Sequence, residues 1–246
     1  LVGRCERLIF ISTISVYRDF ARPEMDESAP LHQVAPGESA SGYGPLKVLC
    51  EAEYRTRWGE RLCILRPGVL CGPFDPTGRL AWWVQRVQQG GSWLLPGEGQ
   101  DRLQYLDVRD CAEFVLRAAE QRLEGCFNLV KPGIALVDWV ERLAARLMPA
   151  SPLQPEWIPW PALIAAGVEP WQSYPTLLPN TQAEFAGYGS ISAEAAIVHG
   201  LNFRPLEETV ADLVAWLASN EQATTTGMTL AEEAALRRRV REHSPS

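Results

Sequence analysis

Lysine is nearly absent from this sequence of 246 residues, which contains only Lys47 and Lys131 among 23 lysines and arginines. Positive charge therefore comes almost entirely from arginine. A lysine retained in such a composition is expected to serve where arginine cannot, for example as a compact point charge. Histidine is scarce as well: its three residues lie far apart and near no acidic cluster, so a metal site is not expected.

Long apolar runs and leader sequences are also missing. No apolar stretch reaches the ~18 residues that a membrane span requires, and no basic-then-apolar leader is visible. The six cysteines form no C-x-x-C pair, which is typical of free thiols in a reducing compartment. The net charge of −7 argues against a nucleic-acid partner. These absences predict a cytoplasmic protein that binds neither membranes nor nucleic acids.

The residues that are present predict a folded α/β protein, because hydrophobic residues make up 46% of the chain. Apolar runs at 7–13, 62–65 and 126–130 are typical of buried parallel strands. Shorter strands are predicted at 92–95 and 103–107. Helices are predicted at 43–58, 80–89, 111–122 (with Asp110 as N-cap), 136–148, 192–199, 206–218 and after a capping box at 229–232. This alternation predicts a parallel sheet with crossover helices.

The composition changes after residue 148, where proline and tryptophan become frequent and irregular backbone is expected. We therefore predict an α/β domain at 1–148, a substrate-binding cap with closing helices at 149–218, and a linker with a C-terminal helix at 219–246. The proline-rich segment is interpreted either as a packed cap or as a pocket lining. The charges of the last helix are expected to form a solvated face.

Tyr43 and Lys47 could carry chemistry, because they lie four residues apart at the start of a predicted helix and share a face. An ammonium beside a phenol favours the phenolate, and such a pair can move a proton to or from a substrate hydroxyl. Thr13 follows a predicted parallel strand, where open α/β sheets bind ligands, and could hold the substrate oxygen. The alternative makes Tyr43 a helix-start aromatic and Lys47 a surface charge.

Six motifs together resemble the extended short-chain dehydrogenases/reductases, the NAD-dependent epimerase/dehydratase family. They are a hydroxyl-rich strand end, a Tyr-x-x-x-Lys pair, an R-P-x-x-x-x-G-P segment, a V-x-D-x-A-like element, an F-N strand and a closing helix, at 11–17, 43–47, 65–73, 106–112, 127–129 and 203–210. Their order and spacing match the family nearly to residue 218. The resemblance implies the C-terminal part of a Rossmann-type parallel sheet, plus a small mixed substrate-binding region.

The resemblance also assigns roles. Thr13, Tyr43 and Lys47 would be catalytic, with Thr13 polarising the substrate oxygen and Tyr43 acting as acid/base. Lys47 would also hold the nicotinamide ribose of NAD or NADP. Tyr43, Pro67, Gly68 and Val69 would contact the cofactor, and Thr13, Arg79 and Trp82 the substrate. Arg79 is equally well interpreted as an exposed helix-start arginine, and Arg66 is expected to be structural. The family resemblance allows a homodimer of the full-length form.

The sequence departs from the family pattern in its nucleotide-binding half. No G-x-G-x-x-G or G-x-x-G-x-x-G lies at a predicted strand-to-helix junction, so roughly 80 residues of that half are expected to be absent. Gly44 and Pro45 are also unusual between the catalytic pair.

The motifs predict an NAD(P)-dependent oxidoreductase or epimerase acting on a hydroxyl or keto group of a sugar nucleotide or similar small molecule. The alternative is a truncated, non-catalytic relative that serves as a binding or scaffold module.

Overall fold

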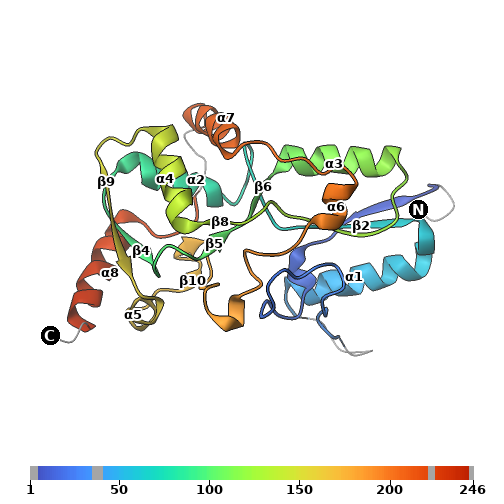
Figure 1. Ribbon diagram of the computed structural model, residues 1–246, viewed down its shortest axis with the longest axis horizontal. Helices are drawn as coiled ribbons and strands as arrows, with labels where there is room; N and C mark the ends of the chain where they lie inside the picture. Colours follow the sequence, from blue (N-terminus) through green and yellow to red (C-terminus); the bar gives the residue numbers. More distant parts are fainter. Residues whose placement is uncertain (1–4, 35–40, 221–224, 244–246) are drawn as a thin grey trace. The chain divides into compact units, whose positions relative to one another are not determined.

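The computed structural model describes residues 5–34, 41–220 and 225–243 (Figure 1). Within the segment predicted as a linker and C-terminal helix, residues 221–224 and 244–246 lie outside the described residues. The chain divides into two compact units that interleave along the sequence. Unit 1 comprises Leu1–Leu70, Gln104–Pro132 and Ala183–Arg204, and unit 2 comprises Cys71–Leu103, Gly133–Gln182 and Pro205–Ser246. The three-part division by sequence order stays a prediction.

Unit 1 is built on a parallel sheet in the order β1-β2-β7, with β1 at Leu8–Ile11, β2 at Leu62–Pro67 and β7 at Gly125–Leu129. Every residue of the central strand β2 is buried. A strand covered on both faces needs a continuous apolar run rather than an alternating one, and the sequence has this run here. The predicted parallel α/β sheet is confirmed.

Helices cover both faces of this sheet: α1 (Tyr43–Trp58) packs against β2, and α3 (Val108–Glu120) packs against β1 (Figure 1). The predicted bounds of α1 are confirmed. Gly59 ends this helix with a φ of 53°, a left-handed conformation that favours glycine. The remaining elements of unit 1 are η1 (Ile14–Val16), η2 (Gly59–Arg61), β6 (Tyr105–Asp107), η3 (Ala183–Phe185) and α6 (Glu194–Val198), and β3 (Val69–Cys71) pairs with β6.

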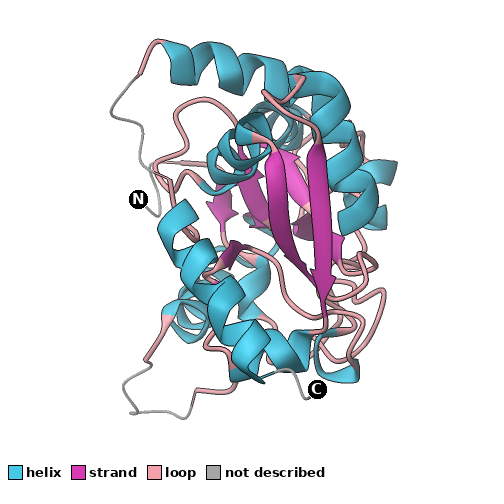
Figure 2. Cartoon of the chain, turned by 90° about the vertical axis from the view of Figure 1, so that its left-hand side faces the viewer, coloured by secondary structure: helices cyan, strands magenta, loops and turns pink. Residues whose placement is uncertain are grey.

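Unit 2 contains a parallel pair formed by β4 (Gly91–Pro96) and β9 (Leu153–Ile158) (Figure 2). Its helices α2 (Arg79–Gln89), α4 (Leu136–Leu147) and α7 (Leu206–Ala218) pack on one another. The other elements are β5 (Arg102–Leu103), β8 (Ile134–Ala135), α5 (Trp160–Ala165), β10 (Pro170–Trp171), β11 (Tyr174–Pro175) and α8 (Leu230–His243). Large aromatic side chains fill the core, including Trp83, Trp93, Trp139 and Tyr174. No helix of the described residues has both the length and the apolar character needed to cross a membrane.

The predicted N-cap of α3 is wrong. The helix begins at Val108, and its N-cap is Asp107, whose carboxylate accepts a hydrogen bond of 2.8 Å from the Arg109 backbone N–H. Asp110 lies buried in the first turn, where it accepts a hydrogen bond of 2.9 Å from the Arg204 backbone N–H and pairs with the Arg204 guanidinium. Either carboxylate suits a cap, and a contact distant in sequence decides between them.

Two other expectations are also corrected. The segment predicted as irregular after residue 148 contains β9 and α5. The capping box that opens α8 is confirmed, because Glu232 Oε2 accepts from the Thr229 N–H at 2.8 Å. However, α8 is not solvated all round: Glu233 is buried and accepts hydrogen bonds from Arg86 and from the Leu94 N–H. Because Glu233 pairs with the buried Arg86, its charge does not belong to a solvated face.

Candidate functional site

The carboxyl ends of the three strands in unit 1 meet at one edge of the sheet. A Cβ atom at Gly68, after β2, would lie 2.8 Å from Val130 Cγ1 and 3.6 Å from Ile14 Cδ1. Val130 follows β7 and Ile14 follows β1, so the segments that leave all three strands are packed together. This edge is where open parallel sheets bind ligands. It carries Thr13, Pro67 and Gly68, three of the predicted site residues.

Thr13 caps the short helix η1 at this edge and is only 7% exposed. Its Oγ1 accepts a hydrogen bond of 3.1 Å from the Ser15 backbone N–H and donates one of 3.2 Å to Ser15 Oγ. The hydroxyl group is therefore held in one orientation at the end of β1.

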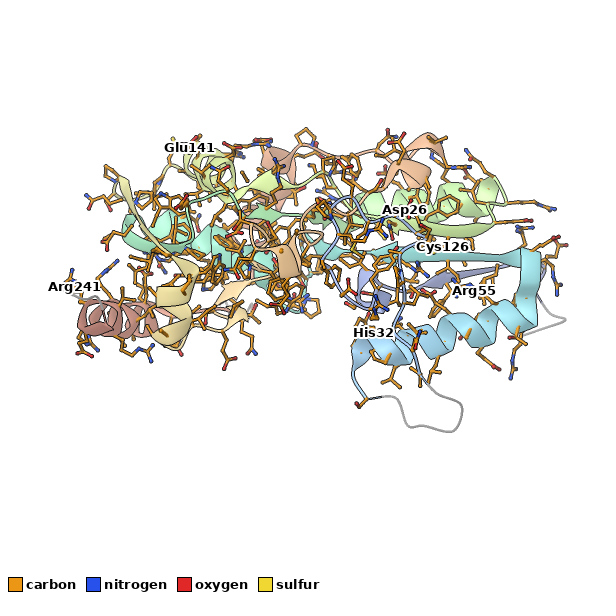
Figure 3. All side chains as sticks on the ribbon, turned by 60° about the horizontal axis from the view of Figure 1, so that its bottom comes forward. Asp26, His32, Arg55, Cys126, Glu141 and Arg241 are labelled. Carbon is orange, nitrogen blue, oxygen red and sulfur yellow. The ribbon has the colours of Figure 1, made fainter. Side chains whose placement is uncertain are left out.

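The first turn of α1 lies directly against this segment. A Cβ atom at Gly44 would lie 2.0 Å from the Ser15 carbonyl oxygen and 3.2 Å from His32 Cδ2. Figure 3 shows His32 beside the first turn of this helix. Only glycine permits such a close approach, which explains the residue that is unusual within the Tyr-x-x-x-Lys pair.

Replacing Gly44 with alanine is expected to destabilise the protein by about 1–3 kcal/mol, because the added methyl group meets backbone that cannot move aside. The clash outweighs the gain of roughly 1 kcal/mol that alanine normally brings to a helix. Urea unfolding measures this change. The exposed Cys50, on the same helix, provides the control Cys50→Ala. Equal stability of the Gly44→Ala variant and the wild type would contradict the close packing.

Lys47 and Tyr43 lie at the same end of α1. The Lys47 ammonium donates a hydrogen bond of 2.8 Å to the Ile11 carbonyl oxygen at the end of β1, and it lies 5.8 Å from the centre of the Tyr43 ring. Tyr43 is 60% exposed. Within the described ranges its hydroxyl group makes no hydrogen bond. The structure thus brings Thr13, Tyr43 and Lys47 to one edge of unit 1.

A buried polar network beneath this edge was not predicted. The Glu51 carboxylate accepts hydrogen bonds from Ser12 Oγ at 2.6 Å and from the Arg66 guanidinium at 2.7 and 3.0 Å. Arg66 also donates to the Tyr17 hydroxyl at 3.2 Å, which in turn donates to Asn128 Oδ1 at 2.6 Å. The network joins β1, α1, β2 and β7. The expectation that Arg66 is structural agrees with these contacts.

The network controls the ionisation of its members. Burial opposes the charged form of Glu51, but hydrogen bonds from Arg66 and Ser12 and the positive charges of Arg66 and Arg55 outweigh it, so the pKa of this carboxyl is lowered. Burial likewise opposes the charge of Arg66, yet the hydrogen bonds to Glu51 raise its pKa. Burial raises the pKa of Tyr17 to about 12. At neutral pH the buried pair is therefore ionised and Tyr17 is neutral.

Glu51 is expected to make stability fall in acid. Because its pKa is lower in the folded than in the unfolded chain, it contributes stability above the unfolded pKa, and this contribution is lost as pH falls through the folded pKa. Unfolding free energies measured by urea from about pH 7 to about pH 3 should fall more steeply for the wild type than for Glu51→Gln. Parallel curves would show that Glu51 does not cause the acid sensitivity.

The predicted substrate residues of unit 2 lie in α2. Arg79 is its first residue, and its guanidinium lies 5.7 Å from the centre of the Trp171 ring. Trp82 is buried, and its indole N–H donates a hydrogen bond of 2.8 Å to the Met228 carbonyl oxygen. Both side chains thus have contacts within unit 2, and their role toward a substrate stays a prediction.

Residues 2–129 match the NAD dependent epimerase/dehydratase family, and this match covers more than half of the chain. The chain belongs to this family. Its description confirms the family resemblance and names the predicted type of cofactor, NAD. No curated protein matches the sequence.

Solved structures share the fold. The enzyme WbmH of Bordetella bronchiseptica, in complex with NAD+, is 18% identical with a TM-score of 0.60, and the match covers 89% of this chain and 64% of that one. A UDP-N-acetylglucosamine 4-epimerase from Methanobrevibacter ruminantium, in complex with UDP-N-acetylmuramic acid, is 15% identical with a TM-score of 0.62 and coverages of 89% and 65%. The chain therefore spans slightly less than two thirds of the length of these proteins.

Proposed function

We propose that unit 1 carries the catalytic groups of an NAD(P)-dependent oxidoreductase or epimerase. The substrate would be a hydroxyl or keto compound, either a sugar nucleotide or a similar small molecule. One observation carries the proposal: the exposed phenol of Tyr43, whose hydroxyl makes no hydrogen bond with other described residues, lies one helical turn from an ammonium that the Ile11 carbonyl oxygen holds in place.

The roles follow from the chemistry of the three groups. The Thr13 hydroxyl would turn away from Ser15 Oγ, to which it donates in this structure, and donate a hydrogen bond to the substrate oxygen at the strand edge. Tyr43, as the phenolate, would take the proton from a substrate hydroxyl, and as the phenol would return it to a keto oxygen in the reverse direction. The Lys47 ammonium would stabilise the phenolate, which is present before the proton is taken and forms again when it is returned.

The donors at this edge fit one part of the cofactor. The Tyr43 hydroxyl and the Lys47 ammonium can hydrogen-bond the hydroxyls of a nicotinamide ribose, and the backbone at 67–69 would face the ring. When bound, NAD or NADP accepts or supplies the hydride at the substrate carbon. The described strand-to-helix turns carry no glycine-rich loop of the pyrophosphate-binding type. The described residues thus fit the nicotinamide riboside end of the cofactor.

Relatives support the substrate class. Among the solved structures with this fold is the UDP-glucose 4-epimerase of Thermotoga maritima, in complex with UDP-glucose, which is 18% identical with a TM-score of 0.58. The same proposal includes a cytoplasmic location, supported by free cysteines in the described residues, and a homodimer of the full-length form.

Lys47→Met is expected to weaken NAD+ binding about 10- to 100-fold, because a charge-assisted hydrogen bond contributes about 1.5–3 kcal/mol. Calorimetric titration of the chain with NAD+ measures this effect. The sequence supplies a matched control, since Lys131→Met removes the only other lysine charge. Turnover is tested with NAD+ and UDP-glucose, UDP-glucuronic acid or UDP-N-acetylglucosamine, with NMR detection of the 4-epimer.

The same titration tests the alternative, a non-catalytic binding or scaffold module. This alternative is favoured because the described strand-to-helix turns carry no glycine-rich loop. Micromolar binding of NAD+ that depends on Lys47 supports the enzyme. Absence of binding to the wild-type chain supports the module.

A further inference from the structure

Helix α1 holds the end of β1 at two consecutive residues. Lys47 Nζ donates a hydrogen bond of 2.8 Å to the Ile11 carbonyl oxygen, and Glu51 Oε1 accepts one of 2.6 Å from Ser12 Oγ. Lys47 and Glu51 are four residues apart and so lie on the same face of the helix. The residue after these two contacts is Thr13.

Glu51 is itself fixed in orientation. Its side chain is fully buried, and Arg66 binds both carboxylate oxygens, with Nε 3.0 Å from Oε1 and Nη2 2.7 Å from Oε2. An ion pair with two parallel hydrogen bonds fixes the orientation of the carboxylate as well as its distance from the guanidinium. Arg55 adds a third donor at 3.0 Å, and Figure 3 shows it farther along α1.

Ser12 is fixed from a second side. Its backbone N–H donates a hydrogen bond of 2.7 Å to the Leu65 carbonyl oxygen in β2, and Arg66 is the next residue of that strand. Glu51 is therefore the point at which the helix, β1 and β2 are held in mutual register at the strand edge.

We propose that Glu51 is a positioning residue, which acts through Ser12 and Arg66 to set where Lys47 and Tyr43 lie relative to Thr13. The catalytic meaning of this placement rests on the proposed function. The placement itself does not depend on it. Without the carboxylate charge, Arg66 loses its partner in a buried site, and the Ser12 hydroxyl loses a strong acceptor. The strand end is then free to shift against the helix.

The scarcity of lysine gives a direct test. A chain labelled with ¹³C-lysine contains only Lys47 and Lys131, so its NMR spectrum has two side-chain Cε–H signals and Lys131 serves as an internal reference. Two variants remove the proposed linkage: Glu51→Gln, and the milder Ser12→Ala, which leaves the Arg66–Glu51 pair intact. The control is Glu53→Gln, a change of the same kind on α1 at a carboxylate that pairs with Arg57 near the surface.

In both Glu51→Gln and Ser12→Ala the Lys47 signal should shift, by at least threefold more than any shift in Glu53→Gln, while the Lys131 signal stays in place. If the Lys47 signal in Ser12→Ala coincides with that of the wild type, the proposal is overturned, even where Glu51→Gln fails to fold.

Turnover with NAD+ and the UDP-sugar giving most product supplies a second readout. In Ser12→Ala, kcat should fall about 10- to 100-fold with KM within about twofold, because small misplacements of catalytic groups act on the chemical step. An unchanged kcat would overturn the proposal. Tyr43→Phe distinguishes failure of this proposal from failure of the proposed function. If that variant keeps full turnover, the proposed function fails, and the lysine signals alone decide the role of Glu51.

Discussion

Replacing Tyr43 with phenylalanine is expected to lower turnover by about 10²- to 10⁴-fold, because the substitution removes the group that transfers the proton. The fold should be unaffected. The ring is 60% exposed, and the hydroxyl makes no hydrogen bond with other described residues. The measurement is kcat for epimerisation of the UDP-sugar panel in the presence of NAD+, with a thermal unfolding curve for each variant.

The control for this experiment lies on the same helix. Tyr54 packs against Phe10 with a distance of 4.8 Å between ring centres, and Tyr54→Phe should retain turnover. Full activity of Tyr43→Phe would remove the proton-transfer role from this residue. Equal losses in both variants would indicate a general effect of changing α1 rather than a specific effect on the chemistry.

Arg66→Leu should have the largest effect on stability, a loss of about 3–5 kcal/mol, because it leaves the Glu51 carboxylate buried without its main partner. Both side chains are inaccessible, with Arg66 at 1% exposed and Glu51 at 0%. Solvent therefore cannot replace the lost interaction. The free energy of unfolding in urea at neutral pH measures the change.

The double variant Glu51→Leu/Arg66→Leu makes this prediction specific. Removing both charges leaves no isolated ion in the core, so the double variant should be more stable than Arg66→Leu alone. The loss of stability in the double variant is compared with the sum of the losses in Arg66→Leu and Glu51→Leu. If the two values are equal, the two residues are not coupled, and the ionic account of the network fails. Arg57→Leu, at an exposed pair, should change stability by less than about 1 kcal/mol.

The local sequence predicts most elements of the fold because their causes are local. The bounds of α1 follow from Gly59, which ends the helix, and β2 follows from an apolar run that only a doubly covered strand requires. The errors occur where a distant residue decides. Asp107 and Asp110 are equally good caps by type, and the contact of Asp110 with Arg204 distinguishes them.

The same distinction applies to the candidate site. Tyr43 and Lys47 share a helix, so their spacing alone predicts that they lie together. Ser12, Glu51 and Arg66 belong to three elements, and no periodicity connects them. Family motifs include Ser12 and Arg66 without relating either to a buried carboxylate. The signal that could have indicated the network is a charged residue on the buried side of α1, four residues after Lys47.

By itself, the sequence determined the parallel α/β class, the helix that carries the Tyr-x-x-x-Lys pair, and membership of the epimerase/dehydratase family, because hydrophobic periodicity, caps and motifs act over a few residues. Only the tertiary structure decided that Gly44 lies against the Ser15 carbonyl oxygen, that Lys47 hydrogen-bonds the end of β1, and that Glu51 joins three elements. Such contacts form between segments separated by tens of residues, and packing in three dimensions selects them.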